Sequence, residues 1–165
     1  MESQAQQILM LAQKLGGVLD EAGAVLATAE SCTGGGIACA ITEVAGSSAW
    51  FDAGFVTYSN AAKRAMLGVR EETLQRFGAV SEAVVLEMVA GALERSVASV
   101  AVSVSGVAGP AGGSEDKPVG TVWIAWQLRG QAGVARLCAF SGDRRSVREQ
   151  AVIAALEGVF AQVCR

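Results

Sequence analysis

The chain has 165 residues, of which 52% are hydrophobic and 18% charged. This length favours one domain over residues 1–165 with a core of its own, and the composition excludes an intrinsically disordered chain. The net charge of −3 argues against a general nucleic-acid binder. No apolar stretch reaches the roughly 18 residues of a membrane span, and the first residues, MESQ, lack the basic start of a signal peptide. We therefore expect a cytoplasmic protein.

The first part of the chain alternates helical and extended patterns. Apolar residues at three- and four-residue spacing predict an amphipathic helix over residues 3–21, which Gly23 ends. An apolar run at 24–27 predicts a strand. The glycine-rich stretch 28–36, TAESCTGGG, then leads into a helix that extends to about residue 42. The order strand, glycine-rich turn, helix suits the binding of anions or oxyanions, and it equally suits a turn that only caps a helix.

The middle of the chain predicts one strand and three helices. Aromatic residues recur through 50–59 and predict a strand. Short helices follow, one from Asn60 to a closing Gly68 and one over 71–77. Ser81 is a good N-cap for a longer helix over 82–96.

The last part of the chain predicts three more strands and a helix. Valine alternates with Ala and Ser in a strand over 97–105, and a loop rich in Gly and Pro fills 106–118. Residues 120–128 and 134–140 predict a hairpin, after which Ser146 is the expected cap of a final helix. Helices between strands favour an α/β fold whose central sheet is covered on both faces, and the late hairpin makes that sheet mixed.

Two serines are expected to share one edge of this sheet. Ser31 and Ser105 each stand where a strand gives way to a glycine-rich loop. If the two strands are parallel neighbours, their carboxyl ends, and so both hydroxyls, lie at the same edge.

The absence of histidine limits the chemistry that the chain can perform. It excludes a Ser-His-Asp triad, a Cys-His pair and any metal site with histidine ligands. A general base must therefore be Lys, Tyr, a carboxylate or water. Lys63, in a mostly apolar segment, is one candidate, and Tyr58, the only tyrosine, is another. From the pattern alone the favoured interpretation of Lys63 is a solvated helix lysine.

Other polar side chains have two interpretations each. Cys32 could act as a nucleophile beside Ser31, but we favour a small buried thiol. The four cysteines form no C-x-x-C pair, so we expect free thiols. Arg144 and Arg145 could clamp a phosphate or carboxylate, or form a charged loop.

Six segments together resemble the CinA C-terminal domain family, the nicotinamide-nucleotide amidases. They occur in the order of the family and are spread over residues 28–148, most of the chain, whose length is similar to the stand-alone form. The segments are TAESCTGG (28–35), GFVTYSNAAK (54–63), GAVSE (78–82), SGVAGPAGG (105–113), KPVGTV (117–122) and GDRRSVR (142–148).

The resemblance implies a three-layer α/β/α fold with a central mixed sheet of about five strands. It also implies deamidation of nicotinamide mononucleotide to nicotinate mononucleotide and ammonia in pyridine nucleotide salvage, with no metal and no cofactor. By position, Ser31 is the expected nucleophile, and Lys63 and Tyr58 handle protons. Ser105 stands where many members have threonine. The expected substrate-binding residues are Thr33, Gly34, Gly35, Ser105, Gly106, Gly109 and Arg144.

The sequence leaves alternatives for the general base, for the phosphate ligand and for the function. Lys63 or Tyr58 could be the base, and Arg145 or Arg148 could hold the phosphate in place of Arg144. The alternative function is a non-catalytic nucleotide-binding or assembly module. We expect a small-molecule nucleotide as the partner, with no nucleic acid and no membrane, and a homo-oligomer, a dimer, in solution.

Overall fold

A mixed sheet of five strands, in the order β2-β1-β3-β4-β5, forms the centre of the computed structural model, which describes residues 1–165. β1 pairs in parallel with β2 and with β3, whereas β4 pairs antiparallel with β3 and with β5. The predicted mixed sheet is therefore confirmed. The strands are β1 (Leu26–Glu30), β2 (Phe51–Val56), β3 (Val100–Gly106), β4 (Thr121–Leu128) and β5 (Val134–Ala139).

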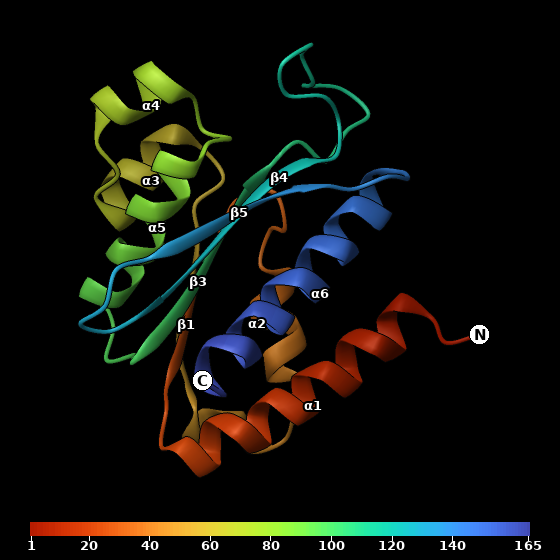
Figure 1. Ribbon diagram of the computed structural model, residues 1–165, viewed down its shortest axis with the longest axis vertical. Helices are drawn as coiled ribbons and strands as arrows, with labels where there is room; N and C mark the ends of the chain where they lie inside the picture. Colours follow the sequence, from red (N-terminus) through yellow and green to blue (C-terminus); the bar gives the residue numbers. More distant parts are fainter.

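Helices cover both faces of this sheet and confirm the three layers (Figure 1). One layer holds α1 (Gln4–Ala22), α2 (Gly36–Thr42) and α6 (Arg144–Val163). The other holds α3 (Asn60–Leu67), α4 (Glu71–Phe77) and α5 (Glu82–Glu94), and a 3-10 turn, η1 (Ser47–Ala49), precedes β2. No helix has both the length and the apolar character that a membrane crossing requires.

The alternating sequence of β3 explains how both layers pack on one strand. Val100, Val102 and Val104 are buried in the apolar cluster beneath α1, α2 and α6. The residues between them are small and face α5, where Ser103 Oγ donates to the carbonyl oxygen of Val85 at 2.6 Å. Small side chains at this face allow α5 to approach the sheet closely, and the hydrogen bond satisfies the buried hydroxyl.

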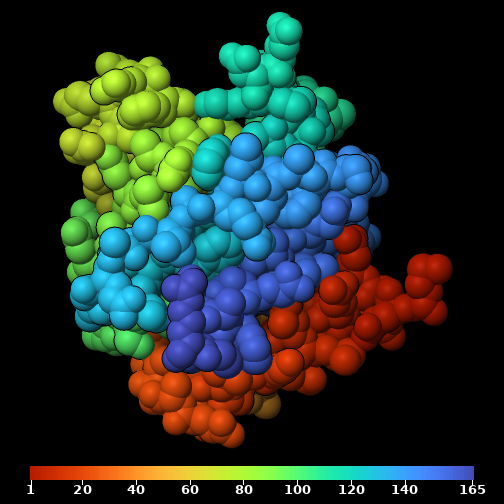
Figure 2. Space-filling view, viewed as in Figure 1, coloured from red at the N-terminus to blue at the C-terminus, as the bar shows by residue number.

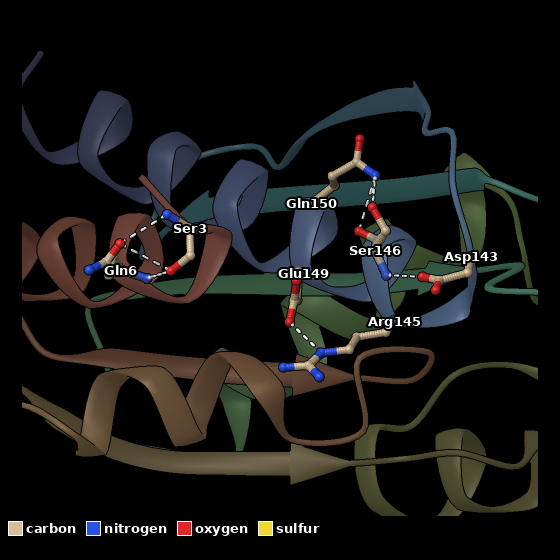
Figure 3. A network of polar contacts seen from close by, with 7 residues as sticks. All are labelled: Ser3, Gln6, Asp143, Arg145, Ser146, Glu149 and Gln150. Atoms are coloured by element: carbon tan, nitrogen blue, oxygen red, sulfur yellow. Dashed lines mark hydrogen bonds and ion pairs between the residues drawn. The ribbon is translucent and has the colours of Figure 1, made fainter. Parts of the chain in front are cut away.

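The N-terminal ends of α1 and α6 are held by side-chain caps, shown in Figure 3. Ser3 and Gln6 form a capping box at the start of α1, and Gly23 ends α1 in the left-handed conformation with φ of 61°, as predicted. The expected cap of α6 was wrong. Asp143 Oδ1 accepts from the N–H of Ser146 at 2.8 Å, so Asp143 is the cap and Ser146 lies inside the first turn.

Strand β2 is shorter than the expected 50–59. It ends at Val56, and Thr57 N donates to the carbonyl oxygen of Glu30 at 2.8 Å. Ser59 then caps α3 by accepting from the N–H of Ala62. The early end of β2 leaves Thr57 and Tyr58 in a connection that crosses the end of β1.

Candidate active site

The carboxyl ends of β1 and β3 lie side by side and bring the two serines to one edge of the sheet, as expected (Figure 1). Ser31 directly follows β1, and its N–H donates to the carbonyl oxygen of Val104 in β3 at 2.9 Å. Ser105 is the next residue of β3. Its hydroxyl donates to the carbonyl oxygen of Ala79 at 2.8 Å and is therefore engaged with the loop before α5.

Lys63 is buried, with 1% of its surface exposed, so the interpretation as a solvated lysine is wrong. α3 directs its side chain across the end of β1. Its Nζ lies 3.0 Å from Ser31 Oγ and donates to the carbonyl oxygen of Thr57 at 3.0 Å. None of the four ion pairs of the chain includes Lys63. Burial without a carboxylate partner disfavours the ammonium form and lowers the pKa of Lys63.

Cys32 is a small buried thiol, as we favoured. Its residue is 6% exposed, and burial raises the pKa of Cys32 to about 11. The thiol is therefore protonated at neutral pH, and a thiol is a much poorer nucleophile than a thiolate. The four cysteines are free, which confirms the expectation from their spacing.

A cavity of about 320 Å³ opens above Ser31 and Lys63. It is bordered by the connection that follows β2, by the segment before α5 and by the loop that joins β3 to β4. Figure 2 shows the surface notched between α4 and that loop. The predicted site residues that line the cavity are Ser31, Tyr58, Lys63, Ser105, Gly106, Gly109 and Arg144.

Arg144 closes one side of this cavity. Its Nη1 donates to the carbonyl oxygen of Gly109 at 2.8 Å, and its Nη2 donates to Tyr58 Oη at 2.9 Å. Tyr58 is 62% exposed, and the hydrogen bond of its hydroxyl is with Arg144. Because Asp143 caps α6, Arg144 lies on the first turn of that helix, which fixes its backbone.

The other two arginines of this region are engaged as well, but with groups outside this cavity or below it. Arg148 donates to the carbonyl oxygens of Cys32 and Thr33, both at 3.1 Å. Arg145 pairs with Glu149 at 2.9 Å, one turn along α6 (Figure 3). Both border a second hollow of about 670 Å³ that Arg144 separates from the cavity.

The glycine-rich turn differs from the expected anion site. Gly34 and Gly35 adopt left-handed conformations, with φ of 60° and 94°, and so turn the chain sharply into α2. The N–H groups of Ile37 and Ala38 at the start of α2 donate to the side chain of Glu30. An internal carboxylate therefore binds the N–H groups that one of the two interpretations of this turn assigned to an anion.

Three predicted substrate-binding residues lie outside the cavity. Thr33 is buried, and its hydroxyl donates to Glu30 Oε1 at 2.6 Å. Thr33, Gly34 and Gly35 do not line the cavity that holds Ser31. Their contact with substrate stays a prediction. Glu30 itself was missed by the sequence analysis, although an acidic residue between Ala29 and Ser31 at the end of an apolar strand is a signal.

The chain is similar to a known protein family, to named relatives and to solved structures. The profile described as CinA C-terminal domain matches residues 9–163. A relative from Escherichia coli K12, named nicotinamide-nucleotide amidohydrolase PncC, is 56% identical over 156 residues, which cover 94% of each chain. A relative of the same name from Pseudomonas putida is 58% identical over 152 residues, covering 92% of this chain and 94% of the relative. The crystal structure of the competence/damage inducible protein CihA from Agrobacterium tumefaciens matches with a TM-score of 0.93 and 48% identity over 96% of both chains.

Proposed function

Because the chain belongs to the CinA C-terminal domain family, we propose that it is a nicotinamide-nucleotide amidase. It hydrolyses the carboxamide of nicotinamide mononucleotide to nicotinate mononucleotide and ammonia. The observation that carries this proposal is the buried pair of Ser31 and Lys63 at the floor of a cavity, with their reacting atoms 3.0 Å apart. A nucleophile within hydrogen-bond reach of a base is the arrangement that acyl transfer requires.

In the first step Ser31 attacks the carboxamide carbon. Neutral Lys63 accepts the hydroxyl proton of Ser31 through its Nζ lone pair, while an N–H of the same amine donates to the carbonyl oxygen of Thr57. The lowered pKa of Lys63 increases the fraction of neutral amine. The new Oγ–C bond turns the carboxamide oxygen into an oxyanion. Cys32 and Gly109 line the cavity, and neither of their N–H groups donates to a carbonyl oxygen of the chain, so both are candidates to donate to that oxyanion.

In the second step the C–N bond breaks. The protonated Lys63 returns its proton to the leaving nitrogen, which departs as ammonia and leaves an ester on Ser31. Water then attacks the ester carbon, Lys63 accepts the proton of that water, and the Ser31 oxygen leaves and is reprotonated. Tyr58 stays an alternative for proton transfer, because it lines the same cavity.

Arg144 is the proposed ligand of the 5′-phosphate. Among Arg144, Arg145 and Arg148, it alone lines the cavity that holds Ser31. Arg148 holds the turn after Ser31, and Arg145 is paired with Glu149. A guanidinium that faces a phosphate forms charge-assisted hydrogen bonds with a planar, bidentate geometry.

Substrates without the phosphate are therefore expected to be poor. Nicotinamide riboside and free nicotinamide lose a charge-assisted contact of about 1.5–3 kcal/mol, which lowers kcat/KM by about 10- to 100-fold. Arg144→Ala is expected to lower kcat/KM for the mononucleotide and to leave that for the riboside nearly unchanged. Arg145→Ala, one residue along the same helix turn, is the control and should behave as wild type. Equal kcat/KM for the mononucleotide and the riboside in the wild-type enzyme would contradict this role of Arg144.

The proposed activity is tested by incubating the pure protein with nicotinamide mononucleotide and measuring ammonia. Release of ammonia in step with nicotinate mononucleotide supports the amidase. Binding of the nucleotide without release of ammonia would instead support the non-catalytic module.

A further inference from the structure

Glu30 is a buried acidic residue that the proposed mechanism does not use, and it comes directly before Ser31. Its exposed fraction is 0%, and none of the four ion pairs includes it. A buried charge without a cation must be compensated by hydrogen-bond donors. The carboxyl group of Glu30 therefore has a structural or functional purpose that outweighs the cost of its burial.

All of the donors to Glu30 come from the chain around the nucleophile. Oε1 accepts from Thr33 Oγ1 at 2.6 Å and from the N–H of Ile37 at 2.8 Å. Oε2 accepts from the N–H of Ala38 at 3.1 Å and, at 3.5 Å, from Thr28 Oγ1. Backbone N–H groups only donate, and a carboxylate only accepts, so the set is complementary. The positive end of the α2 dipole adds to this stabilisation.

These bonds hold Ser31 between two fixed points. On the sheet side, the N–H of Ser31 donates to Val104, and the carbonyl oxygen of Glu30 accepts from Thr57. On the helix side, the Glu30 carboxylate binds the turn and the first residues of α2. Arg148 holds the carbonyl oxygens of Cys32 and Thr33 from α6. The backbone around Ser31 is thus tied to β3, α2 and α6.

We infer that Glu30 is a positioning residue for the nucleophile: its carboxylate ties the glycine-rich turn to the end of β1 and so keeps Ser31 Oγ within reach of Lys63 Nζ. This inference rests on the proposed function, because it assigns Glu30 a role in the same reaction. Glu30 does not line the cavity, and its oxygens accept from donors in β1, the turn and α2 rather than from Ser31 or Lys63. Its effect therefore acts through the geometry of Ser31 and not through contact with substrate.

Glu30→Gln tests this role with a side chain of the same shape. The amide keeps one acceptor oxygen and replaces the other with an NH₂ group. That group cannot accept a hydrogen bond, so the bonds that one of the two carboxylate oxygens accepts are lost. A displacement of the nucleophile by a fraction of an ångström is expected to lower kcat at least about tenfold, with KM for nicotinamide mononucleotide close to wild type. Thr33→Val removes one donor to the same carboxylate, and we expect a smaller fall in kcat that adds little to Glu30→Gln.

Glu87→Gln is the matched control. Glu87 also accepts hydrogen bonds from a backbone N–H and a threonine hydroxyl, those of Arg70 and Thr73, but it joins α4 to α5 away from the cavity. Its loss is expected to lower the melting temperature and to leave kcat unchanged. A Glu30→Gln enzyme whose melting temperature falls while its kcat stays at the wild-type value would overturn the inference. A raised KM with normal kcat would overturn it as well, because that pattern indicates a contact with substrate.

The rate at which a fluorophosphonate labels Ser31 gives a second readout that does not depend on the amide substrate. Slower labelling in Glu30→Gln than in wild type and Glu87→Gln supports the positioning role, and equal rates contradict it. If wild type is labelled at Ser31 but releases no ammonia from nicotinamide mononucleotide, the proposed function fails while the labelling rates still decide the role of Glu30.

Discussion

Replacement of Ser31 by alanine is expected to abolish the amidase activity. The substitution removes the oxygen that forms the ester and leaves Lys63 with no group to deprotonate, 3.0 Å from an empty position. Water has access to the cavity but lacks the fixed geometry of Ser31, which accounts for a large part of the rate in covalent catalysis. The measurement is ammonia release from nicotinamide mononucleotide at saturating substrate, beside a thermal melt that confirms folding.

Cys32→Ala is the control for this experiment, because Cys32 stands next to Ser31 and is the other candidate nucleophile. Its thiol is buried and its pKa is raised to about 11, so almost no thiolate exists at neutral pH. Cys32→Ala is therefore expected to keep most of the activity. An inactive, folded Cys32→Ala enzyme together with an active Ser31→Ala enzyme would reverse the assignment of the nucleophile.

Lys63→Met is expected to remain folded and to lose at least about a hundredfold in kcat, the range in which a general acid–base group acts. Methionine fills the buried space but has no lone pair of comparable basicity for the Ser31 proton. Lys63→Arg should be nearly as inactive, since a guanidinium does not give up its proton and its planar shape does not fit the position of an amine. The measurement is kcat for both variants beside their melting temperatures. A folded Lys63→Met enzyme with near-normal kcat would leave Tyr58 or water as the base.

The stability of Lys63→Met follows from the same pKa shift. Because the pKa of Lys63 is lower in the folded chain than in the unfolded chain, the unfolded chain binds this proton more tightly. At neutral pH the lysine therefore lowers the free energy of unfolding, and this effect diminishes as pH rises toward the 10.5 of a solvated lysine. Lys63→Met removes this effect and also the hydrogen bonds to Ser31 and Thr57, and because the two changes act in opposite directions its melting temperature should be close to that of wild type.

Local patterns predicted the elements that position the site. Ser81, the predicted cap of α5, accepts from the N–H of Val84 within its own helix turn, so its effect is readable from neighbouring residues. The order of strands and helices predicted a mixed sheet, and the parallel pairing of β1 with β3, which the sequence left as a condition, brings Ser31 and Ser105 to one edge. These features depend on short-range geometry and on general rules of chain connection.

Contacts between residues far apart in the sequence could not be predicted from local patterns. The apolar neighbours of Lys63 left its burial open, because the partner Ser31 is 32 positions away in the sequence. Glu30 was missed because its meaning depends on the N–H groups of α2, which face it only once the turn has formed. Asp143 and Ser146 are both good cap residues three positions apart, and the structure starts α6 at Arg144, so Asp143 is the cap.

Activation of Ser31 by neutral Lys63 is tested most sharply by the pH dependence of kcat/KM for nicotinamide mononucleotide. Burial lowers the pKa of Lys63, so the wild-type value should rise with pH along a limb whose midpoint lies below 10.5, the ordinary value of lysine. That limb should be retained in Tyr58→Phe and absent from the residual activity of Lys63→Met. A limb that persists in Lys63→Met and disappears in Tyr58→Phe would contradict the account and assign the base to Tyr58.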